Sequence, residues 1–327
     1  MSARTRVFAI VGAAAVVAVG GIVAATLLQS NGQKAATPNG AVTKPRPGAP
    51  PLILDLGVRS DPEARALAQA SSLYRAQHRA AAGRIFARYH SLEAQIGAAF
   101  AAWPKGGLDT LKSLVASHPT SALAELHLGY AYLWSGRNAD ALTALRKAVK
   151  LRPDSMSAVY ASDLLHTSFA PGLPYIVTDL QPPAGVTALP AAQELAALAR
   201  AAARPDANAK ILYGIALWHL DRPVSAERQF HAAAALAPND PMAQTAAAVG
   251  AFTKAQPVLA FSKLGPLTGR FPKSAVVRFH LGVLLLWSGD IAKAQKQLRL
   301  AVSDGPTTPF GLSATKLLAA LGHNGTK

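Results

Sequence analysis

The sequence predicts an all-α protein built from repeated antiparallel helix pairs. Half of its 327 residues are hydrophobic, and much of that fraction is alanine, a strong helix former. Only 6% of the residues are aromatic, and the runs of Val, Ile, Thr and Tyr that are typical of strands are scarce. The chain also repeats itself, because the decapeptide from His127 to Gly136 returns in similar form from His280 to Gly289. Prolines recur at a spacing of 34 residues, at Pro119 and Pro153 and again at Pro238, Pro272 and Pro306.

A spacing of 34 residues is the length of a tetratricopeptide repeat, and the segment from Ala122 to Pro153 resembles one. Its matching positions are Leu128, Gly129 and Tyr132 in the first helix, Gly136 in the turn, and Ala141, Leu145, Ala148 and Pro153 in the second helix and at its end. A second copy has Tyr213, Gly214, Leu217, Ala226, Phe230, Ala233 and Pro238, and a third has Leu281, Gly282, Leu285, Gly289, Ala294, Leu298, Ala301 and Pro306. The resemblance implies a superhelix of helix pairs that binds other proteins.

The glycines of this pattern indicate close helix packing. Glycine inside a helix costs about 1 kcal/mol relative to alanine, yet Gly129, Gly214 and Gly282 stand at one phase of the repeat. We therefore expect the first helix of each pair to approach the second helix closely at this position. The proline that follows each second helix cannot continue it, and so marks its end.

The repeat domain is predicted over residues 61–323, followed by a tail at 324–327. The unit from Pro241 to Pro272 keeps the phase but lacks the signature glycine, and the unit that ends at Pro119 is out of step. The interval from Pro153 to Pro205 is longer than one period, which predicts an insertion near residues 170–189. A last helix is expected over residues 309–321, ended by Gly322.

The N-terminal part predicts a membrane anchor and a spacer. Val7–Leu28 has no charged residue and, as a helix of roughly 33 Å, is long enough to span a bilayer. Arg4 and Arg6 precede it, so residues 1–6 are expected in the cytoplasm and the remaining chain outside it. A cleaved signal peptide is the alternative, although the small residues at 23–25 lie inside the apolar run. Residues 29–60 contain five prolines and predict an extended, solvated linker.

Composition narrows the possible chemistry. The chain has no cysteine, which excludes disulfides, cysteine-ligated zinc and a thiol nucleophile. The nine histidines form no metal-binding motif, and no phosphate-binding loop or nucleophile motif is present, so neither an enzyme nor a cofactor is predicted. His127 and His280 share a repeat position, which indicates a role in helix packing. The net charge of +16 favours anionic surroundings, or else a solvated basic surface of a bacterial protein.

In tetratricopeptide arrays the first helices line a concave groove, and the resemblance implies that this lining binds a partner. The residues expected there are Leu126, Tyr130, Leu133 and Trp134 in one repeat, Ile215 and Trp218 in the next, Phe252 in the degenerate one, and Phe279, Val283 and Trp287 in the last. This apolar lining fits an amphipathic helix or an extended hydrophobic segment. Alternatively, these side chains are simply buried by tight curvature, by the insertion or by self-association.

The sequence therefore predicts a single-pass inner-membrane protein that presents a protein-binding or peptide-binding scaffold outside the cytoplasm. Two alternatives stay open. In the first, the basic repeat domain binds an anionic polymer, such as a cell-wall polyanion, acidic lipid or, less favoured, nucleic acid. In the second, the chain is the adaptor of an enzyme whose catalytic subunit is a different protein. A steep dependence of binding on salt would distinguish the polymer from a protein partner.

Overall fold

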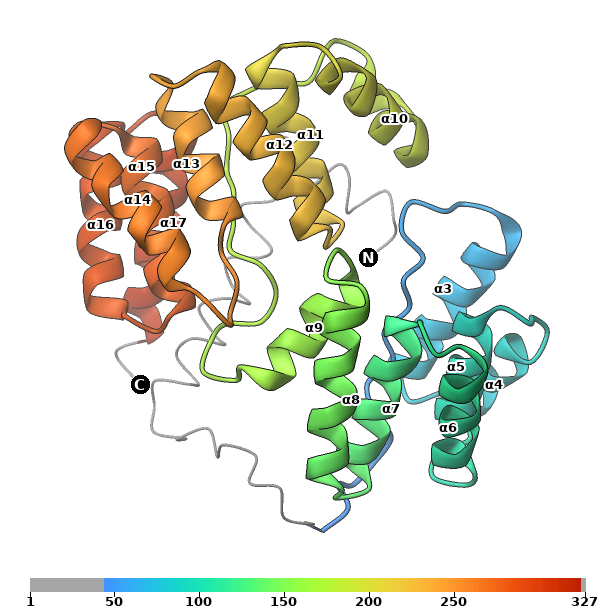
Figure 1. Cartoon of the computed structure of the whole chain (residues 1–327). Helices are drawn as coiled ribbons and strands as arrows, with labels where there is room; N and C mark the ends of the chain where they lie inside the picture. The colour runs from blue at the N-terminus through green and yellow to red at the C-terminus, as the bar shows by residue number, and fades with distance from the viewer. Residues whose placement is uncertain (1–43, 325–327) are drawn as a thin grey trace. The chain divides into compact units, whose positions relative to one another are not determined.

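The computed structural model describes residues 44–324, and over these residues the chain forms α-helices and one short 3-10 helix without any strand. The chain divides into two compact units (Figure 1). Their described parts are residues 44–165, here called the N-terminal unit, and residues 166–324, called the C-terminal unit. The predicted all-α repeat architecture is thus confirmed for the described residues.

The N-terminal unit consists of an extended segment and seven helices. The helices are α3 (Pro62–Arg75), α4 (Arg79–Phe86), α5 (Leu92–Ala101), α6 (Gly107–Ser117), α7 (Ala122–Trp134), α8 (Asn138–Leu151) and α9 (Met156–Leu165). Consecutive helices pack against each other as the pairs α3–α4, α5–α6 and α7–α8, and α9 packs on α8 (Figure 1).

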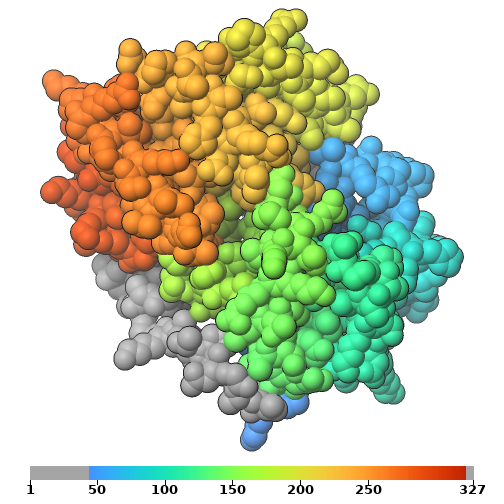
Figure 2. All heavy atoms as spheres, viewed as in Figure 1, coloured from blue at the N-terminus to red at the C-terminus, as the bar shows by residue number. Residues whose placement is uncertain are grey.

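The C-terminal unit begins with an irregular segment that ends at the 3-10 helix Val186–Ala188. Its helices are α10 (Ala191–Ala202), α11 (Ala207–His219), α12 (Pro223–Leu236), α13 (Pro241–Gly250), α14 (Val258–Arg270), α15 (Ala275–Trp287), α16 (Ile291–Asp304) and α17 (Pro309–Asn324). The pairs are α11–α12, α13–α14 and α15–α16, and α17 packs on α16. Side chains of α12 and α14 cover the side of this unit that faces the viewer in Figure 2.

Local sequence explains where the first helix of each pair begins and ends. Five of these helices begin after a side chain that accepts a hydrogen bond from a backbone N–H in the first turn, a favourable N-cap. The capping residues are Asp61, Ser91, Ser121, Asp206 and Asp240. The turns after α7 and α15 contain Gly136 and Gly289 at positive φ, a conformation that glycine adopts without strain.

The predicted close approach at the signature glycines is present, and a large side chain of the second helix lies opposite each glycine. A Cβ added to Gly129 would lie 2.8 Å from Leu145, and one added to Gly282 would lie 2.9 Å from Leu298. At Gly214 the obstructing side chain is Phe230, at 2.5 Å. The glycines therefore make room for the large side chain of the second helix.

Three parts of the sequence-based expectation differ from the structure or lie outside it. Within the predicted linker, residues 44–48 are exposed, but most of residues 49–58 are partly or fully buried instead of solvated, and Leu52 is only 5% exposed. The helix α17 continues through Gly322 to Asn324, so that glycine does not end it. The anchor predicted at Val7–Leu28 lies outside the described residues. Among the described residues, no helix is both long enough and apolar enough to span a membrane.

Candidate functional site

An extended segment of the chain itself lies against the first helices of the N-terminal unit. We call residues 46–56 the first strap. The backbone N–H of Arg46 donates to the carbonyl of Trp134 at the end of α7, over 2.9 Å. The hydroxyl of Tyr74 on α3 donates to the carbonyl of Pro50 over 2.6 Å. The side chain of Leu52 joins the hydrophobic core of the unit. The strap thus contacts two separate repeats.

The C-terminal unit holds a second extended segment, residues 170–180, which we call the second strap. It contacts α11, α15 and the residue Lys254 that follows α13, and Figure 1 shows it passing beside α13. The backbone N–H of Ala170 donates to the carbonyl of Trp287 over 3.1 Å, and the indole N–H of Trp218 donates to the carbonyl of Pro174 over 2.7 Å. Lys254, which follows α13, donates from Nζ to the carbonyl of Ala170 over 2.5 Å. This strap lies within the predicted insertion.

Two buried histidines bind the straps through the same atoms. Nε2 of His127 accepts the backbone N–H of Ile53 over 3.2 Å, and Nε2 of His280 accepts that of Val177 over 3.0 Å. In each ring Nδ1 lies 2.7 Å from the carbonyl four residues earlier on the same helix. Nδ1 must therefore carry the proton and Nε2 the lone pair. Both rings are neutral, because burial lowers the pKa of each histidine to about 4.

The ten residues predicted to line the groove all lie in the described helices or directly after one. Nine are buried, with exposed fractions between 0 and 6%, and Trp134 is partly exposed. Several of them contact a strap directly. The indole N–H of Trp287 lies 3.4 Å from the carbonyl of Gly172, and its ring packs edge-on against Tyr175. In the C-terminal unit, the insertion thus covers predicted lining residues, which was one of the alternatives.

Trp134 contacts the first strap, but it is more exposed than Trp287. Its carbonyl accepts the N–H of Arg46, and the guanidinium of Arg46 lies 5.1 Å from the centre of its ring. This is a cation–π arrangement, which favours a basic residue at the start of the first strap. The indole N–H of Trp134 is buried without a hydrogen-bond partner, in contrast to that of Trp287.

Sequence reasoning missed four residues that bind the straps: Tyr74, His127, His280 and Lys254. The two histidines were interpreted as helix-packing residues, whereas each uses one ring nitrogen to hold the strap. A usable signal was present, because residues 46–56 (RPGAPPLILDL) and 170–180 (APGLPYIVTDL) share a motif. The 34-residue period does not contain this shared motif, because the straps lie outside the helical repeat. Among the described residues, no cluster of histidine, aspartate and glutamate is suited to hold a metal ion.

Comparison with protein families identifies the class of one part of this fold. Residues 123–155 match the family model for the tetratricopeptide repeat. They comprise α7 from its second residue, all of α8 and the turn that follows. The match therefore falls at the position where the sequence resembles a tetratricopeptide repeat at every signature residue. A search of curated protein sequences finds no match to the chain.

Solved structures that are similar to this chain share little sequence identity with it. YrrB, described as a TPR protein with an unusual peptide-binding site, is 16% identical with a TM-score of 0.31, over 64% of this chain and 99% of YrrB. Yeast Tom70 is 14% identical with a TM-score of 0.37, over 94% of this chain and 55% of Tom70. The TPR2AB domain of yeast Sti1, in complex with pHSP90, is 15% identical with a TM-score of 0.31, over 81% and 98%.

Proposed function

We propose that this chain is a membrane-anchored scaffold that binds a protein or peptide partner and presents its helical repeats outside the cytoplasm. It acts by binding rather than by catalysis, and it needs no cofactor. The first strap is contacted by Tyr74, His127 and Trp134, and the second strap by Trp218, Lys254, His280 and Trp287. We call each of these two groups the strap-bearing face of its unit.

The observation that carries the proposal is that each unit holds an extended stretch of polypeptide through hydrogen bonds to the main chain. Pro50 and Ile53 are bound in this way in the N-terminal unit, and Pro174 and Val177 in the C-terminal unit. Main-chain hydrogen bonds supply affinity in peptide recognition, and pockets for side chains supply specificity. A face that holds the chain's own segments in this way has the groups that are needed to hold a partner's segment.

The proposed anchor is supported by sequence alone. Val7–Leu28 is an uncharged stretch of 22 residues, and Arg4 and Arg6 precede it. Positive charges next to an apolar span favour the cytoplasmic side for that end. A reporter enzyme that is active only outside the cytoplasm should therefore work when it is fused after Lys327. Activity of a cytoplasmic reporter at that position, or release of a soluble chain cut near residue 25, would overturn the predicted topology.

The function is tested by crosslinking the full-length chain in its native membranes and identifying the captured proteins by mass spectrometry. We expect a protein partner whose capture persists when the salt concentration is raised, because apolar contacts are not screened by ions. A chain that lacks residues 7–28 is the matched control and should capture less of a membrane-associated partner. Recovery of no protein above the background of an unrelated anchored chain would contradict the proposal.

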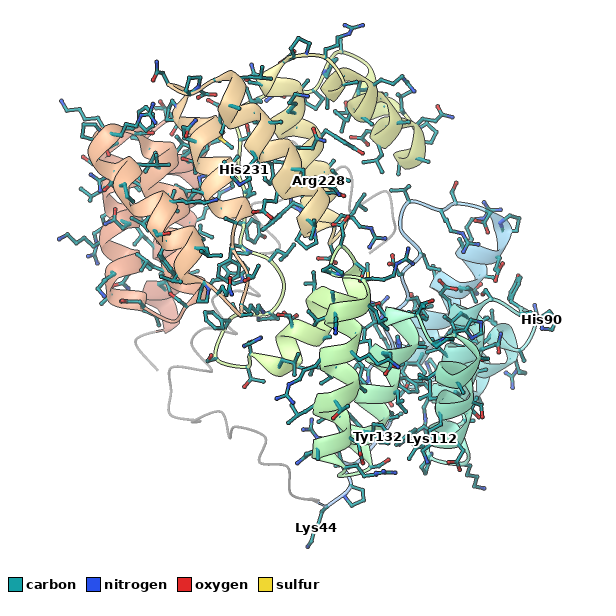
Figure 3. All side chains as sticks on the ribbon, viewed as in Figure 1. Lys44, His90, Lys112, Tyr132, Arg228 and His231 are labelled. Atoms are coloured by element: carbon teal, nitrogen blue, oxygen red, sulfur yellow. The ribbon has the colours of Figure 1, made fainter. Side chains whose placement is uncertain are left out.

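An anionic polymer is the second candidate, and the observation that favours it is the net charge of +16. Exposed basic side chains such as Lys44, Lys112 and Arg228 extend from the described surface (Figure 3). Binding to a polyanion releases counterions, so the logarithm of the affinity would fall linearly, with a steep slope, as the logarithm of the salt concentration rises. Such a dependence, measured with the full-length chain, would favour the polymer over a protein partner.

A further inference from the structure

The two straps are copies of one motif. Residues 46–56 and 170–180 are identical at the second, third and fifth positions, which are Pro, Gly and Pro, and at the last two, which are Asp and Leu. At the seventh and eighth positions each strap has an aliphatic residue. Gly48 and Gly172 have φ values of +75° and +77°, so the chain bends in the same way at both. A Cβ at either glycine would meet no atom within 4 Å. Glycine is therefore required here for its backbone conformation rather than for space.

The same three main-chain groups of each strap are bound by its unit. The first residue of the strap, Arg46 or Ala170, donates its N–H to a tryptophan carbonyl. The carbonyl of the motif's second proline accepts a hydrogen bond from a side chain of the first helix pair of its unit. The donor is Tyr74 for Pro50 and Trp218 for Pro174. The eighth residue, Ile53 or Val177, donates its N–H to a histidine. Across these three contacts the two faces differ only in the side chain that donates to the proline carbonyl, and they bind the same backbone pattern.

Side-chain burial also repeats along the two straps. The second proline of the motif, Pro50 or Pro174, is buried in each. Two residues further on, Leu52 and Ile176 are 5% and 4% exposed. The residue between them is open, since Pro51 is exposed and Tyr175 partly exposed. This alternation is that of an extended chain. Two positions of the motif, the second proline and the residue two places after it, are therefore buried in both straps.

From these repeated contacts we infer that both strap-bearing faces recognise one class of ligand, an extended peptide of the pattern Pro-Gly-x-Pro-x-Φ-Φ, where Φ is a branched aliphatic residue. Each strap is a built-in copy of that ligand. A partner protein with an exposed segment of this pattern displaces the strap and takes over its three main-chain hydrogen bonds. The inference rests on the proposed function, because it names the chemistry of the partner that the scaffold binds.

The test uses the full-length chain with its second strap loosened. Ile176→Asp places a carboxylate at a buried position, which is unfavourable without a partner for its charge. Gly172→Val loosens the strap differently, because a β-branched residue is strained at positive φ, and it leaves the helices unchanged. Thr178→Asp is the matched control. It adds the same charge at a partly exposed position and keeps an acceptor for the N–H of Leu180.

The probes are dye-labelled peptides of residues 168–182 and 44–58, and binding is measured by fluorescence polarisation. Each loosened variant should bind both peptides. Its affinities for the two peptides should differ by no more than about tenfold, which corresponds to about 1.4 kcal/mol. The unmodified chain and the Thr178→Asp control should bind at least about tenfold more weakly, because their own straps compete. A 168–182 peptide that carries Ile176→Asp should not bind.

Three results would overturn the inference. The first is that a loosened variant with unchanged helical circular dichroism binds neither peptide. The second is that a scrambled 168–182 peptide binds equally well. The third is that the loosened variants form dimers without peptide, which would assign the faces to a second copy of the chain. A crosslinked partner without the motif would contradict this inference and leave the proposed scaffold function standing.

Discussion

Replacing Trp287 by alanine is expected to lower the free energy of unfolding of the C-terminal unit by about 3–5 kcal/mol, the range for truncating a buried tryptophan. The side chain is 2% exposed and packs edge-on against Tyr175 of the second strap. Its indole N–H also lies 3.4 Å from the carbonyl of Gly172. The substitution therefore leaves a cavity and removes contacts that hold the strap. Urea unfolding of the full-length chain, followed by circular dichroism, measures the loss.

Two variants separate these contributions. Trp287→Phe keeps an aromatic ring but not the indole N–H, so it should cost clearly less than alanine. Trp134→Ala should also cost less than Trp287→Ala, because Trp134 is partly exposed and its indole N–H has no hydrogen-bond partner to lose. If Trp287→Ala leaves the unfolding free energy unchanged but reduces capture of a partner, the side chain is an accessible contact residue rather than part of the core.

Acidification from pH 7 to pH 5 is expected to destabilise each unit by about 2 kcal/mol through its strap-binding histidine alone. Burial lowers the pKa of His127 and of His280 to about 4 in the folded chain, against an ordinary value near 6.5. Between these two values the unfolded chain takes up a proton and the folded chain does not. Stability therefore falls as the pH drops below about 6.5, and the loss levels off near pH 4.

The physical reason for this sensitivity is the hydrogen bond from the strap. A proton on Nε2 of either histidine would point at the backbone N–H of Ile53 or Val177, which is also a donor. The matched variants are His127→Gln and His280→Gln, since a glutamine amide offers an acceptor and a donor but does not titrate in this range. Urea unfolding at pH 7 and pH 5 should show a smaller difference in each variant than in the unmodified chain. An equal pH dependence would mean that other groups cause it.

Much of the helical architecture follows from local sequence. Helix starts follow from short polar caps such as Asp61 and Ser121, and the turn after α7 follows from a glycine at positive φ. The pairing of α7 with α8 follows from Gly129, whose missing side chain makes room for Leu145. These signals involve residues within one repeat, so a 34-residue period contains them. The apolar lining was predictable for the same reason, because its residues recur at fixed phases of the first helices.

What occupies that lining was decided by tertiary structure. His127 meets Ile53 across 74 positions of the chain, and His280 meets Val177 across 103. Neither contact falls within one repeat, and the straps have no helical period that would link them to the helices. A proline-rich extended segment exposes unpaired main-chain groups, and these are satisfied wherever a folded surface offers a matching donor or acceptor. The sequence by itself therefore determined the helices and the phase of their apolar residues. Only the folded chain brought the straps onto them, because main-chain recognition between distant segments leaves little trace in side-chain patterns.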